Sequence, residues 1–525
     1  MAKRKARVEF TIKRIKGFLS ALRRSKRGLF GIFILIVAVF VAVAAPLITP
    51  YDPINSRSLA GKLAQPTWAR YLPWGGGLSE NFVPVDESAL LQSPNALKEF
   101  NITVTPSSQN VVVQHSAYGI NPKGLGSLAI IYQSAGLPIN SSLTIRITKD
   151  FYYPYSGVPG TMITSAALLM SRIEGTAVSP SLILRQNWPT YISPNLSSYN
   201  ITRFQFGANP QPPHNQIPIV YTEDNFTGMF AVAHALNWQS PQGLQPLESS
   251  GMGVITLRQL FPRSGSYTYG IEITVTKLTP NAEAAIYLDN LQLRLLGSSW
   301  GLLGTDNEGR DVFSQLVYGT RISLYVGLVA SIIGVVIGLA VGLVSAYLGG
   351  IVDEVLMRFT DSLLVLPGLP LMIVLITILS SGQYNLNIFI MVIGFLGWMG
   401  FARVVRSQVL SLKERPYVEA AKAVGAGTPY ILVRHILPNV VTLIYVTLAL
   451  SVPSAIVSEA AFSFLGFIDL SQMSWGRMLN SMIGRPEIWW LVIPAGLAIA
   501  ILSLSFILLG YAMDEILNPK LRARR

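Results

Sequence analysis

Apolar residues gather into six long runs along the chain, one near its start and five in its second half. The first run, residues 28–48, contains no charged residue, and its 21 positions are enough for a helix to cross a hydrocarbon core of about 30 Å. The other runs lie at 322–346, 363–381, 386–404, 440–461 and 489–511. The pattern predicts a polytopic α-helical membrane protein with six spans.

A different pattern fills the interval between the first two runs, where Pro, Ser, Asn, Gly and Thr are frequent. Apolar and polar residues alternate at 143–148, 271–276 and 291–295, which is typical of strands with one buried face. We therefore expect residues 50–300 to form an inserted, mainly β domain, a β-sandwich with one helix at 162–173. Its segment AAIYLDNLQLRLLG is similar to the closing strand of jelly-roll carbohydrate-binding modules.

The net charge of +13 is concentrated beside the apolar runs. Residues 1–27 hold eleven basic residues and one acidic residue, whereas residues 52–321 hold sixteen of each. Under the positive-inside rule, this distribution places both termini and the charged segment 408–439 in the cytoplasm. The domain at 50–300 then lies outside a plasma or inner membrane. The stretch 347–367 is predicted to be cytoplasmic although it is net acidic, a small exception to the rule.

The basic N-terminal segment also carries apolar residues at helical spacing: Phe10, Ile12, Ile15, Phe18, Leu19 and Leu22. That spacing predicts an amphipathic helix on the inner surface of the lipid membrane. Residues 513–525 form a second basic cytoplasmic tail. Because the charge is concentrated beside the spans, it favours anionic lipid and argues against a nucleic-acid partner.

Several kinds of chemistry are excluded by composition. The chain contains no cysteine, so disulfides, thiolate metal sites and cysteine nucleophiles are absent. Its four histidines lack the spacing of metal ligands. No GxxxxGK[ST] sequence occurs, so we expect no ATP site, no catalytic residue and no bound cofactor in this chain.

The charged segment between the fourth and fifth runs is predicted to be helix, break, helix. Gly425 and Gly427 interrupt good helix formers, Thr428 is expected to cap the second helix ahead of Pro429, and Pro438 is expected to end it. On charge alone, this segment could be an ordinary basic cytoplasmic loop.

The residue order indicates more. EAA, three residues, Gly425 and nine further residues before HILP resemble the EAA loop of ABC importer permeases, and RHILPN is similar to their dipeptide/oligopeptide branch. The resemblance implies a type I ABC importer permease fold, in which the loop docks on an ATPase subunit. It assigns coupling to Tyr417, Glu419, Ala420, Ala421, Gly425, Arg434, His435, Leu437 and Pro438.

Partners follow from the same resemblance. They are a second homologous permease subunit, two ATP-binding subunits that carry ATP and Mg, and an extracytoplasmic substrate-binding protein. The chain itself would then be a transport subunit and not an enzyme.

A second stretch, LLGTDNEGRDVFSQLVYGTRISLYVG, resembles the signature that precedes the second span in dipeptide/oligopeptide permeases. We expect an amphipathic outer-surface segment at 301–321. The signature residues are Gly304, Thr305, Asp306, Gly309, Arg310 and Asp311.

One acidic residue falls inside an apolar run. Glu459 belongs to SEAAFSFLG, which is similar to a family stretch that also includes Ser463 and Gly466. We expect Glu459 to lie near the outer end of its span, where water reaches it, with a gating or structural role.

Five N-x-[ST] sequons lie in the β domain, at Asn101, Asn140, Asn195, Asn200 and Asn225. They allow two interpretations, N-glycosylation of a cell-surface domain or coincidence in an Asn-rich sequence.

The sequence therefore predicts six segments: a basic tail (1–27), a first span (28–49), the β domain (50–300), the outer segment (301–321), a five-span core (322–512) with the EAA loop at 411–438, and a tail (513–525). Its predicted function is the permease subunit of an ATP-driven importer, forming half of the translocation path for di- and oligopeptides or similar small oligomers. Oligosaccharides are the alternative substrate, and a membrane-anchored receptor or lectin is the alternative function. An ion-driven transporter fits less well because Glu459 is the one carboxylate within a predicted span. We expect the β domain to dock the binding protein or cap the path.

Overall fold

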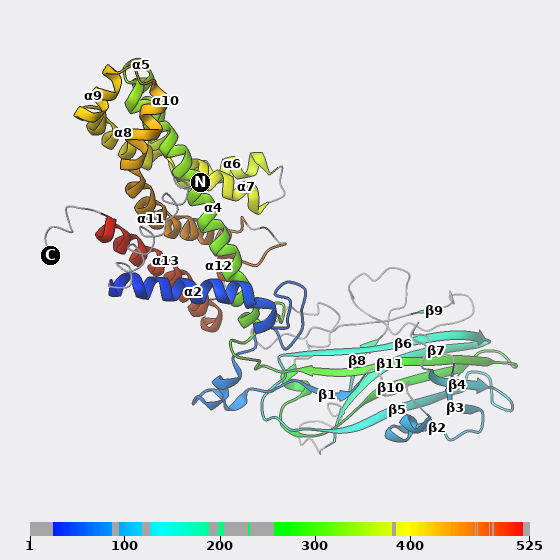
Figure 1. Cartoon of the computed structure of the whole chain (residues 1–525). Coiled ribbons are helices and arrows are strands. Elements are labelled where there is room, and N and C mark those ends of the chain that lie inside the picture. Colours follow the sequence, from blue (N-terminus) through cyan, green and yellow to red (C-terminus); the bar gives the residue numbers. More distant parts are fainter. Residues whose placement is uncertain are drawn as a thin grey trace, which may run out of the picture. The chain divides into compact units, whose positions relative to one another are not determined.

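The structure is a computed structural model that describes residues 25–86, 94–117, 126–187, 198–203, 229–230, 257–380, 385–467, 469, 471–481, 483–485 and 488–517. The chain divides into two compact units (Figure 1). The helical unit is Met1–Ser56 with Asp311–Arg525, and the β unit is Arg57–Arg310. The β unit is therefore inserted into the sequence of the helical unit.

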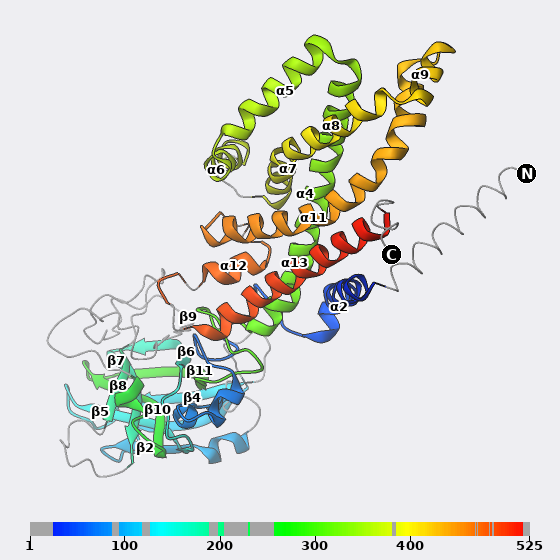
Figure 2. The same ribbon diagram turned by 90° about the vertical axis from the view of Figure 1, so that its left-hand side faces the viewer.

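Long apolar helices form most of the helical unit (Figure 2). Its helices are α2 (Lys26–Ile48), α4 (Val312–Leu348), α5 (Gly350–Val365), α6 (Gly368–Leu379), α7 (Leu386–Leu396), α8 (Met399–Lys413), α9 (Pro416–Ala423), α10 (Thr428–Ile431), α11 (Leu437–Phe464), α12 (Trp475–Asn480) and α13 (Trp489–Leu517). Within the described residues, five helical segments are long and apolar enough to cross a membrane, and a sixth is added if α5 and α6 count as one bent span.

Small residues allow these helices to approach closely. A Cβ atom on Gly338 or Gly342 of α4 would lie 2.7 Å from the Trp398 carbonyl oxygen or 2.6 Å from the Ala402 carbonyl oxygen. On the same helix, Gly327 faces Ile456 of α11 at 2.7 Å. The glycines of α4 therefore serve helix packing, as small residues commonly do in membrane proteins.

The predicted span at 363–381 is wrong in its shape. The chain forms α5 and α6 at an angle of 97° to each other. Leu366 has extended dihedral angles (φ −68°, ψ 138°) because the following residue is Pro367, whose ring disfavours helical geometry in the residue before it. The apolar run continues across this break, so its hydrophobicity alone did not reveal the bend.

The separate outer-surface segment at 301–321 is also not observed. Helix α4 begins at Val312 and runs without interruption into the second span, while 301–311 lies outside any helix. Asp311 caps α4 by accepting a hydrogen bond from the Ser314 backbone N–H at 2.7 Å. The apolar run at 322–346 predicted only the part of α4 that follows the polar first turns of this helix.

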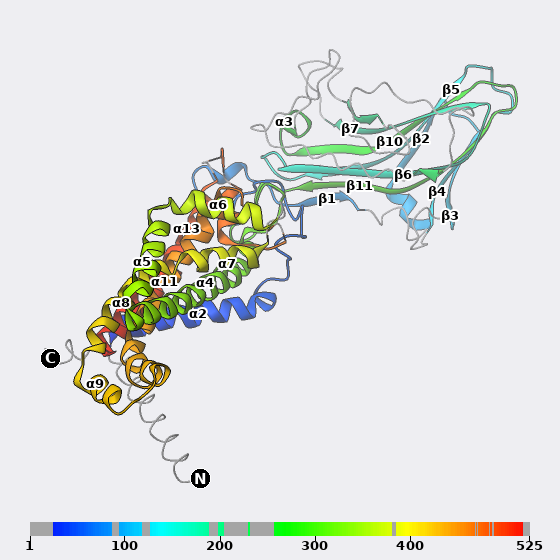
Figure 3. The ribbon, with the colours of Figure 1, turned by 90° about the horizontal axis from the view of Figure 1, so that it is seen from above.

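The β unit is built from two antiparallel sheets (Figure 3). Its strands are β1 (Phe82–Val85), β2 (Asn101–Thr105), β3 (Val111–Ser116), β4 (Ser127–Gln133), β5 (Ser142–Tyr153), β6 (Thr161–Glu174), β7 (Thr176–Gln186), β8 (Ser198–Arg203), β9 (Met229–Phe230), β10 (Gly265–Lys277) and β11 (Glu283–Leu296). Short helices lie at Thr67–Tyr71, Gly75–Gly77, Pro94–Glu99 and, as α3, at Leu257–Leu260. One sheet has the order β3-β4-β11-β6-β9 with β1 also paired to β11, and the other has the order β2-β5-β10-β7-β8.

Alternation along the strands places side chains from both sheets in one core. In β10, Ile271, Ile273 and Val275 are fully buried, whereas Glu272 pairs with Arg146 of β5 on the other face. Leu128 of β4 belongs to the same buried cluster. This arrangement agrees with the strands predicted from period-two alternation.

The helix predicted at 162–173 is instead strand β6. Its neighbour β11 pairs with it over most of its length, with Leu295 opposite Met162 and Ala284 opposite Ile173. Leu and Ala favour helices in isolation, but a place in the interior of a sheet supplies hydrogen bonds and burial that outweigh this preference.

Candidate functional site

The EAA segment forms a compact helical loop between α8 and α11. Helix α9 ends at Ala423, and Gly425 then adopts a φ of +84°, a conformation that favours glycine. Gly427 occupies the cap position of α10, so Thr428 is its first helical residue and not the predicted cap. This turn folds α9 back toward α10.

Pro438 does not end the second helix, contrary to the sequence prediction. A π-helical turn at Leu432–Ile436 connects α10 to α11, and the Leu437 backbone N–H bonds to the Leu432 carbonyl oxygen. Proline is excluded from regular helix interiors because it lacks an N–H and its ring meets the carbonyl four residues earlier. The widened turn accommodates Pro438 in the first turn of α11, so the loop continues directly into that helix.

One face of the loop is fixed by apolar contacts. Val418, Ile431 and Ile436 are at most 1% exposed and belong to the same buried cluster as Val405 and Val409 of α8. The loop also contacts the end of α4. Those polar contacts come from Lys413, which donates to the Ala346 carbonyl oxygen at 3.1 Å, and from Lys422, which lies over the Tyr347 ring at 5.6 Å.

The opposite face carries exposed apolar side chains. Val424 is 89% exposed, Val433 65%, Tyr430 57% and Tyr417 42%. Of the other residues assigned to coupling, Glu419, Ala420, Arg434 and Pro438 are exposed, and Ala421 and Leu437 are half-buried. The loop therefore has one anchored face and one accessible face.

His435 joins the parts of the loop. Its ring centroid lies 6.3 Å from that of Tyr417 and 5.7 Å from that of Tyr430. Asn439 donates to the His435 carbonyl oxygen at 2.7 Å and to the Tyr417 hydroxyl at 3.4 Å. The structure thus brings together Tyr417 and His435, which sequence reasoning assigned to coupling but did not place in contact.

Two ion pairs beside the loop were missed by sequence reasoning. Asp353 of α5 pairs with Arg406 of α8 through two hydrogen bonds of 2.6 and 2.5 Å, and Asp361 accepts from Arg403 Nε at 3.1 Å. They explain why the stretch 347–367 is net acidic, since both carboxylates face arginines of α8. The acidic residues of 347–367 and the arginines of α8 carry opposite charges, and this difference could have predicted the two ion pairs.

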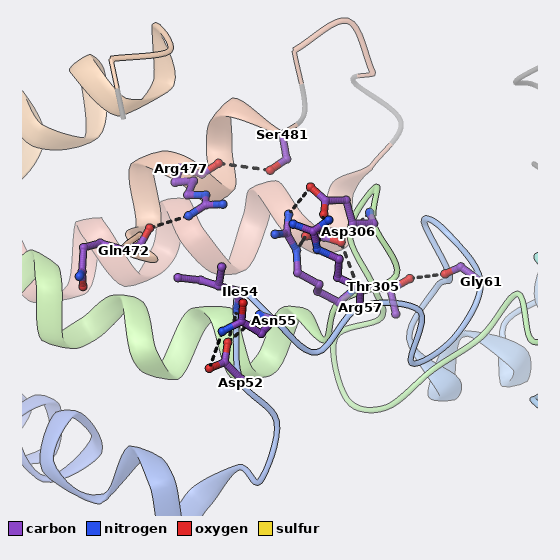
Figure 4. A network of polar contacts seen from close by, with 12 residues as sticks. Asp52, Ile54, Asn55, Arg57, Gly61, Thr305, Asp306, Gln472, Arg477 and Ser481 are labelled. Carbon is purple, nitrogen blue, oxygen red and sulfur yellow. Dashed lines mark hydrogen bonds and ion pairs between the residues drawn. The ribbon is translucent and has the colours of Figure 1, made fainter. Parts of the chain in front are cut away.

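The second signature, in the β unit, folds around Asp306 (Figure 4). This carboxylate is fully buried and accepts from Arg310 Nε at 2.8 Å, from the Arg310 backbone N–H at 3.0 Å and from the Glu308 backbone N–H at 2.8 Å. Thr305 donates to the Gly61 carbonyl oxygen at 2.6 Å. These contacts hold residues 305–310 together and attach them to Gly61 within the β unit.

The two glycines of this signature have positive φ angles, +73° at Gly304 and +72° at Gly309. A Cβ on Gly309 would lie 2.6 Å from the Ala60 carbonyl oxygen. The signature therefore specifies a tight turn next to residues 58–64 of the same unit, and Asp311 begins α4 directly after it.

Glu459 is 2% exposed, so the expectation that water reaches it from the bulk is wrong. Its Oε1 accepts from Ser463 at 2.8 Å, and its Oε2 has no hydrogen-bond partner among the described residues. It lines a cavity of about 20 Å³ with Asn385 and Asp469, which is room for about one water molecule. Neighbouring α12 covers this region, because a Cβ on Gly476 would lie 2.6 Å from Cβ of Ser463. Gly466 follows α11 with a φ of +96°.

The sequons are only partly described. Asn101, at the start of β2, and Asn140, in the turn before β5, are exposed in the β unit. Asn200 lies in β8, and Asn195 and Asn225 lie outside the described residues. Whether any is glycosylated stays a prediction.

The helical unit thus combines apolar helices of membrane-spanning length with a helical loop anchored on α8 and α4. Two family descriptions match the chain: "Binding-protein-dependent transport system inner membrane component" at residues 334–523, and "N-terminal TM domain of oligopeptide transport permease C" at residues 14–66. The stretch 67–333 falls outside both matches and contains most of the β unit.

Curated proteins similar to this chain are also transport permeases. The oligopeptide transport system permease protein OppC of Bacillus subtilis (strain 168) is 39% identical over 224 residues, which cover 42% of this chain and 72% of the relative. The dipeptide transport system permease protein DppC of the same organism is 38% identical over 250 residues, 47% of this chain and 76% of the relative. The glutathione transport system permease protein GsiD of Pectobacterium atrosepticum is 37% identical over 246 residues, 46% of this chain and 80% of the relative.

The chain therefore belongs to the binding-protein-dependent transport system inner membrane component family and is homologous to the OppC and DppC permeases of peptide ABC importers. Among solved structures, the MetNI methionine ABC transporter in inward-facing conformations gives a TM-score of 0.33 at 20% identity, covering 40% of this chain and 96% of that chain. A β-sandwich carbohydrate-binding module gives 0.20 at 14% identity, covering 45% and 63%. Neither score is high enough to support an argument about this chain.

The buried ion pair in the β unit gives a prediction. Asp306→Ala removes the fully buried carboxylate from the Arg310 ion pair and leaves the guanidinium, 5% exposed, its contact with the partly exposed Glu308, and we expect a loss of roughly 3 kcal/mol in the unfolding free energy of the β unit. Glu308→Gln alters a carboxylate that is 38% exposed and should cost less than about 1 kcal/mol. Thermal unfolding of the two purified full-length variants compares them. Equal stability of the two variants would show that the Asp306–Arg310 ion pair does not stabilise the β unit.

Proposed function

We propose that this chain is the permease subunit of an ATP-driven peptide importer and that its EAA loop couples the membrane helices to an ATPase. A second homologous permease completes the translocation path, two ATP-binding subunits bind ATP and Mg, and a binding protein delivers the substrate. The observation that carries this proposal is the two-faced loop, anchored on one side and exposing Val424, Tyr430 and Val433 on the other. The names of the relatives support peptides as the substrate class.

The exposed face fits a protein partner better than water. Apolar and aromatic side chains are typical of the buried centre of protein interfaces, with charged residues at the rim. Arg434, which is exposed in the same loop, supplies such a charged residue. A groove on an ATPase subunit that receives this face would make close contact with a rigid loop.

The contacts within the loop support transmission of movement. The Tyr417–His435–Tyr430 ring contacts and the bonds from Asn439 hold α9 to the π-helical turn. The chain then passes directly into α11, which runs from Leu437 to Phe464. When the ATPases close on ATP, a displacement of the loop would therefore move α11 and α8 together, and the path would change from inward-facing to outward-facing.

The even number of spans and the distribution of basic residues indicate the membrane topology. If the α5–α6 pair counts as one span, the helical unit has six, and both termini lie on one side of the membrane. The eleven basic residues in 1–27 favour the cytoplasmic side. The EAA loop is then cytoplasmic, and the β unit, which we interpret as a β-sandwich, lies outside.

We also propose that the β unit helps the binding protein to dock or caps the path. Most of the β unit can be replaced by a short linker, because the segments that enter and leave it meet at Gln65 and Ser299. These two residues form a parallel bridge, and the Gln65 backbone N–H bonds to the Ser298 carbonyl oxygen at 2.9 Å. A Gly/Ser linker in place of residues 66–297 keeps this bond and spares the contacts of Thr305 with Gly61 and Ala64.

Removal of the β unit is expected to abolish peptide import while the shortened chain still inserts and still purifies with its ATPases. Uptake into proteoliposomes, with binding protein present, measures this. Import at the wild-type rate would exclude a docking or capping role.

Gly425→Pro is expected to abolish import without preventing insertion, because proline requires a φ near −65° and Gly425 has +84°. Gly427→Ala is the matched control. Its φ is −68°, and the nearest atom to an added Cβ is Pro429 Cδ at 3.9 Å. Import and ATP hydrolysis are measured on equal amounts of inserted protein. Normal import by the Gly425→Pro variant would contradict the coupling role of this turn.

A further inference from the structure

Three aromatic side chains are exposed in one short segment of the β unit, residues 67–78. Tyr71 is 90% exposed, Trp74 65% and Trp68 41%. Leu302, which is 57% exposed, lies beside this segment, because the Trp68 indole N–H donates to its carbonyl oxygen at 2.8 Å. Single exposed apolar residues are common, but several together indicate an interaction surface. We call Trp68, Tyr71, Trp74 and Leu302 the aromatic patch.

The aromatic patch lies where the chain enters and leaves the β unit. The Thr67 backbone N–H bonds to the Gly301 carbonyl oxygen at 3.0 Å. The Trp300 backbone N–H bonds to the Gln65 carbonyl oxygen at 2.8 Å. The patch is therefore fixed to the two segments that connect the β unit to the rest of the chain.

Both connecting segments lead directly to membrane helices. Helix α2 ends at Ile48, and Asp311, nine residues after Leu302, is the cap residue of α4. Because an extended chain covers at most about 3.5 Å per residue, the patch lies within roughly 30 Å of the start of α4. The true reach is shorter, since the Asp306 backbone N–H bonds back to the Arg310 carbonyl oxygen at 3.0 Å. The lipid surface is thus the partner nearest to the patch along the chain.

The chemistry of the patch fits the boundary between lipid and water. Trp and Tyr are enriched at that boundary because their rings are largely apolar and carry one polar group. Arg70 is the one charged residue in 66–79, and it pairs with Glu80 of the same unit, while the Trp68 indole N–H is bonded to a backbone carbonyl. A site for a sugar or a peptide would instead direct polar groups toward its ligand.

We propose that the aromatic patch inserts into the headgroup region of the lipid bilayer, on the face of the membrane where α2 ends and α4 begins. The partner is the lipid surface itself. Insertion holds the β unit against the membrane and limits its movement about the two connecting segments. This inference does not depend on what the helical unit transports.

The absence of cysteine from the sequence permits a direct test. A Tyr71→Cys variant of the full-length chain carries a small fluorescent label on its single thiol and is reconstituted into phosphatidylcholine nanodiscs without any other protein. Ile139→Cys is the matched control, because Ile139 is also an exposed apolar residue of the β unit.

The two labelled positions lie far apart. Ile139 precedes the first residue of β5, whereas Ser156, just after its last residue, donates to the Gly76 carbonyl oxygen at 3.3 Å beside the patch. The twelve residues of β5 separate these ends by about 40 Å. Lipid that reaches one label therefore does not reach the other.

Replacing the lipid by a phosphatidylcholine brominated near its headgroup should remove most of the fluorescence of the label at position 71, because bromine quenches on contact. The label at position 139 should keep its fluorescence. Iodide dissolved in the water should have the opposite effect, quenching the label at 139 and sparing the label at 71.

Removing other members of the patch tests whether the patch itself causes insertion. With the label at position 71, Trp74→Ser combined with Leu302→Ser should restore most of the fluorescence in brominated lipid. Val112→Ser combined with Ile139→Ser removes two exposed apolar side chains elsewhere in the β unit and should leave the quenching unchanged.

Two results would overturn the inference. One is a label at position 71 that brominated lipid does not quench, or quenches no more than the label at 139. The other is a label at 71 that iodide reaches until maltotriose or a substrate-binding protein is added, which would assign the patch to a sugar or to a protein. Neither result bears on the proposed import, since the nanodiscs contain no ATPase.

Discussion

The helical unit depends on one constraint, that hydrocarbon offers no hydrogen-bond partner to a polypeptide backbone. Regular helices satisfy it along most of α2, α4, α11 and α13. The departures are therefore informative. The chain leaves regular α-helix at 366–367, at 397–398 and, with wider hydrogen bonding, at 432–436. The first and the last have a local cause in Pro367 and Pro438.

These departures divide the helical unit into segments. The break at 366–367 separates α5, which is tied to α8 by the Asp353–Arg406 ion pair, from α6. The widened turn at 432–436 leaves the EAA loop and α11 as one continuous element. In the proposed coupling role, a displacement of the loop would therefore be passed to α11.

Much of this arrangement could be predicted from the sequence because hydrophobic length and residue order are strong signals. The apolar runs located the membrane helices, and EAA-x3-G located the loop that the structure anchors through Val418 and Ile431. The bend at Pro367 and the passage of α11 through Pro438 were missed for local reasons, since the apolar run continues across the first proline and a widened turn accommodates the second. The strand at 162–173 could not be predicted, because it depends on pairing with β11, which is remote in sequence. Burial of Glu459 depends likewise on packing by α12.

The central claim is that this chain works as the permease of an ATP-driven importer through a loop that receives ATPase subunits. Affinity purification of the tagged chain in mild detergent, with mass identification of its companions and assay of ATP hydrolysis, tests it most directly. The account predicts two P-loop ATPases, a second six-span permease, and hydrolysis that rises when the binding protein is added. A chain that purifies alone, without ATPase and without stimulated hydrolysis, would contradict it and would point to the β unit as the functional part.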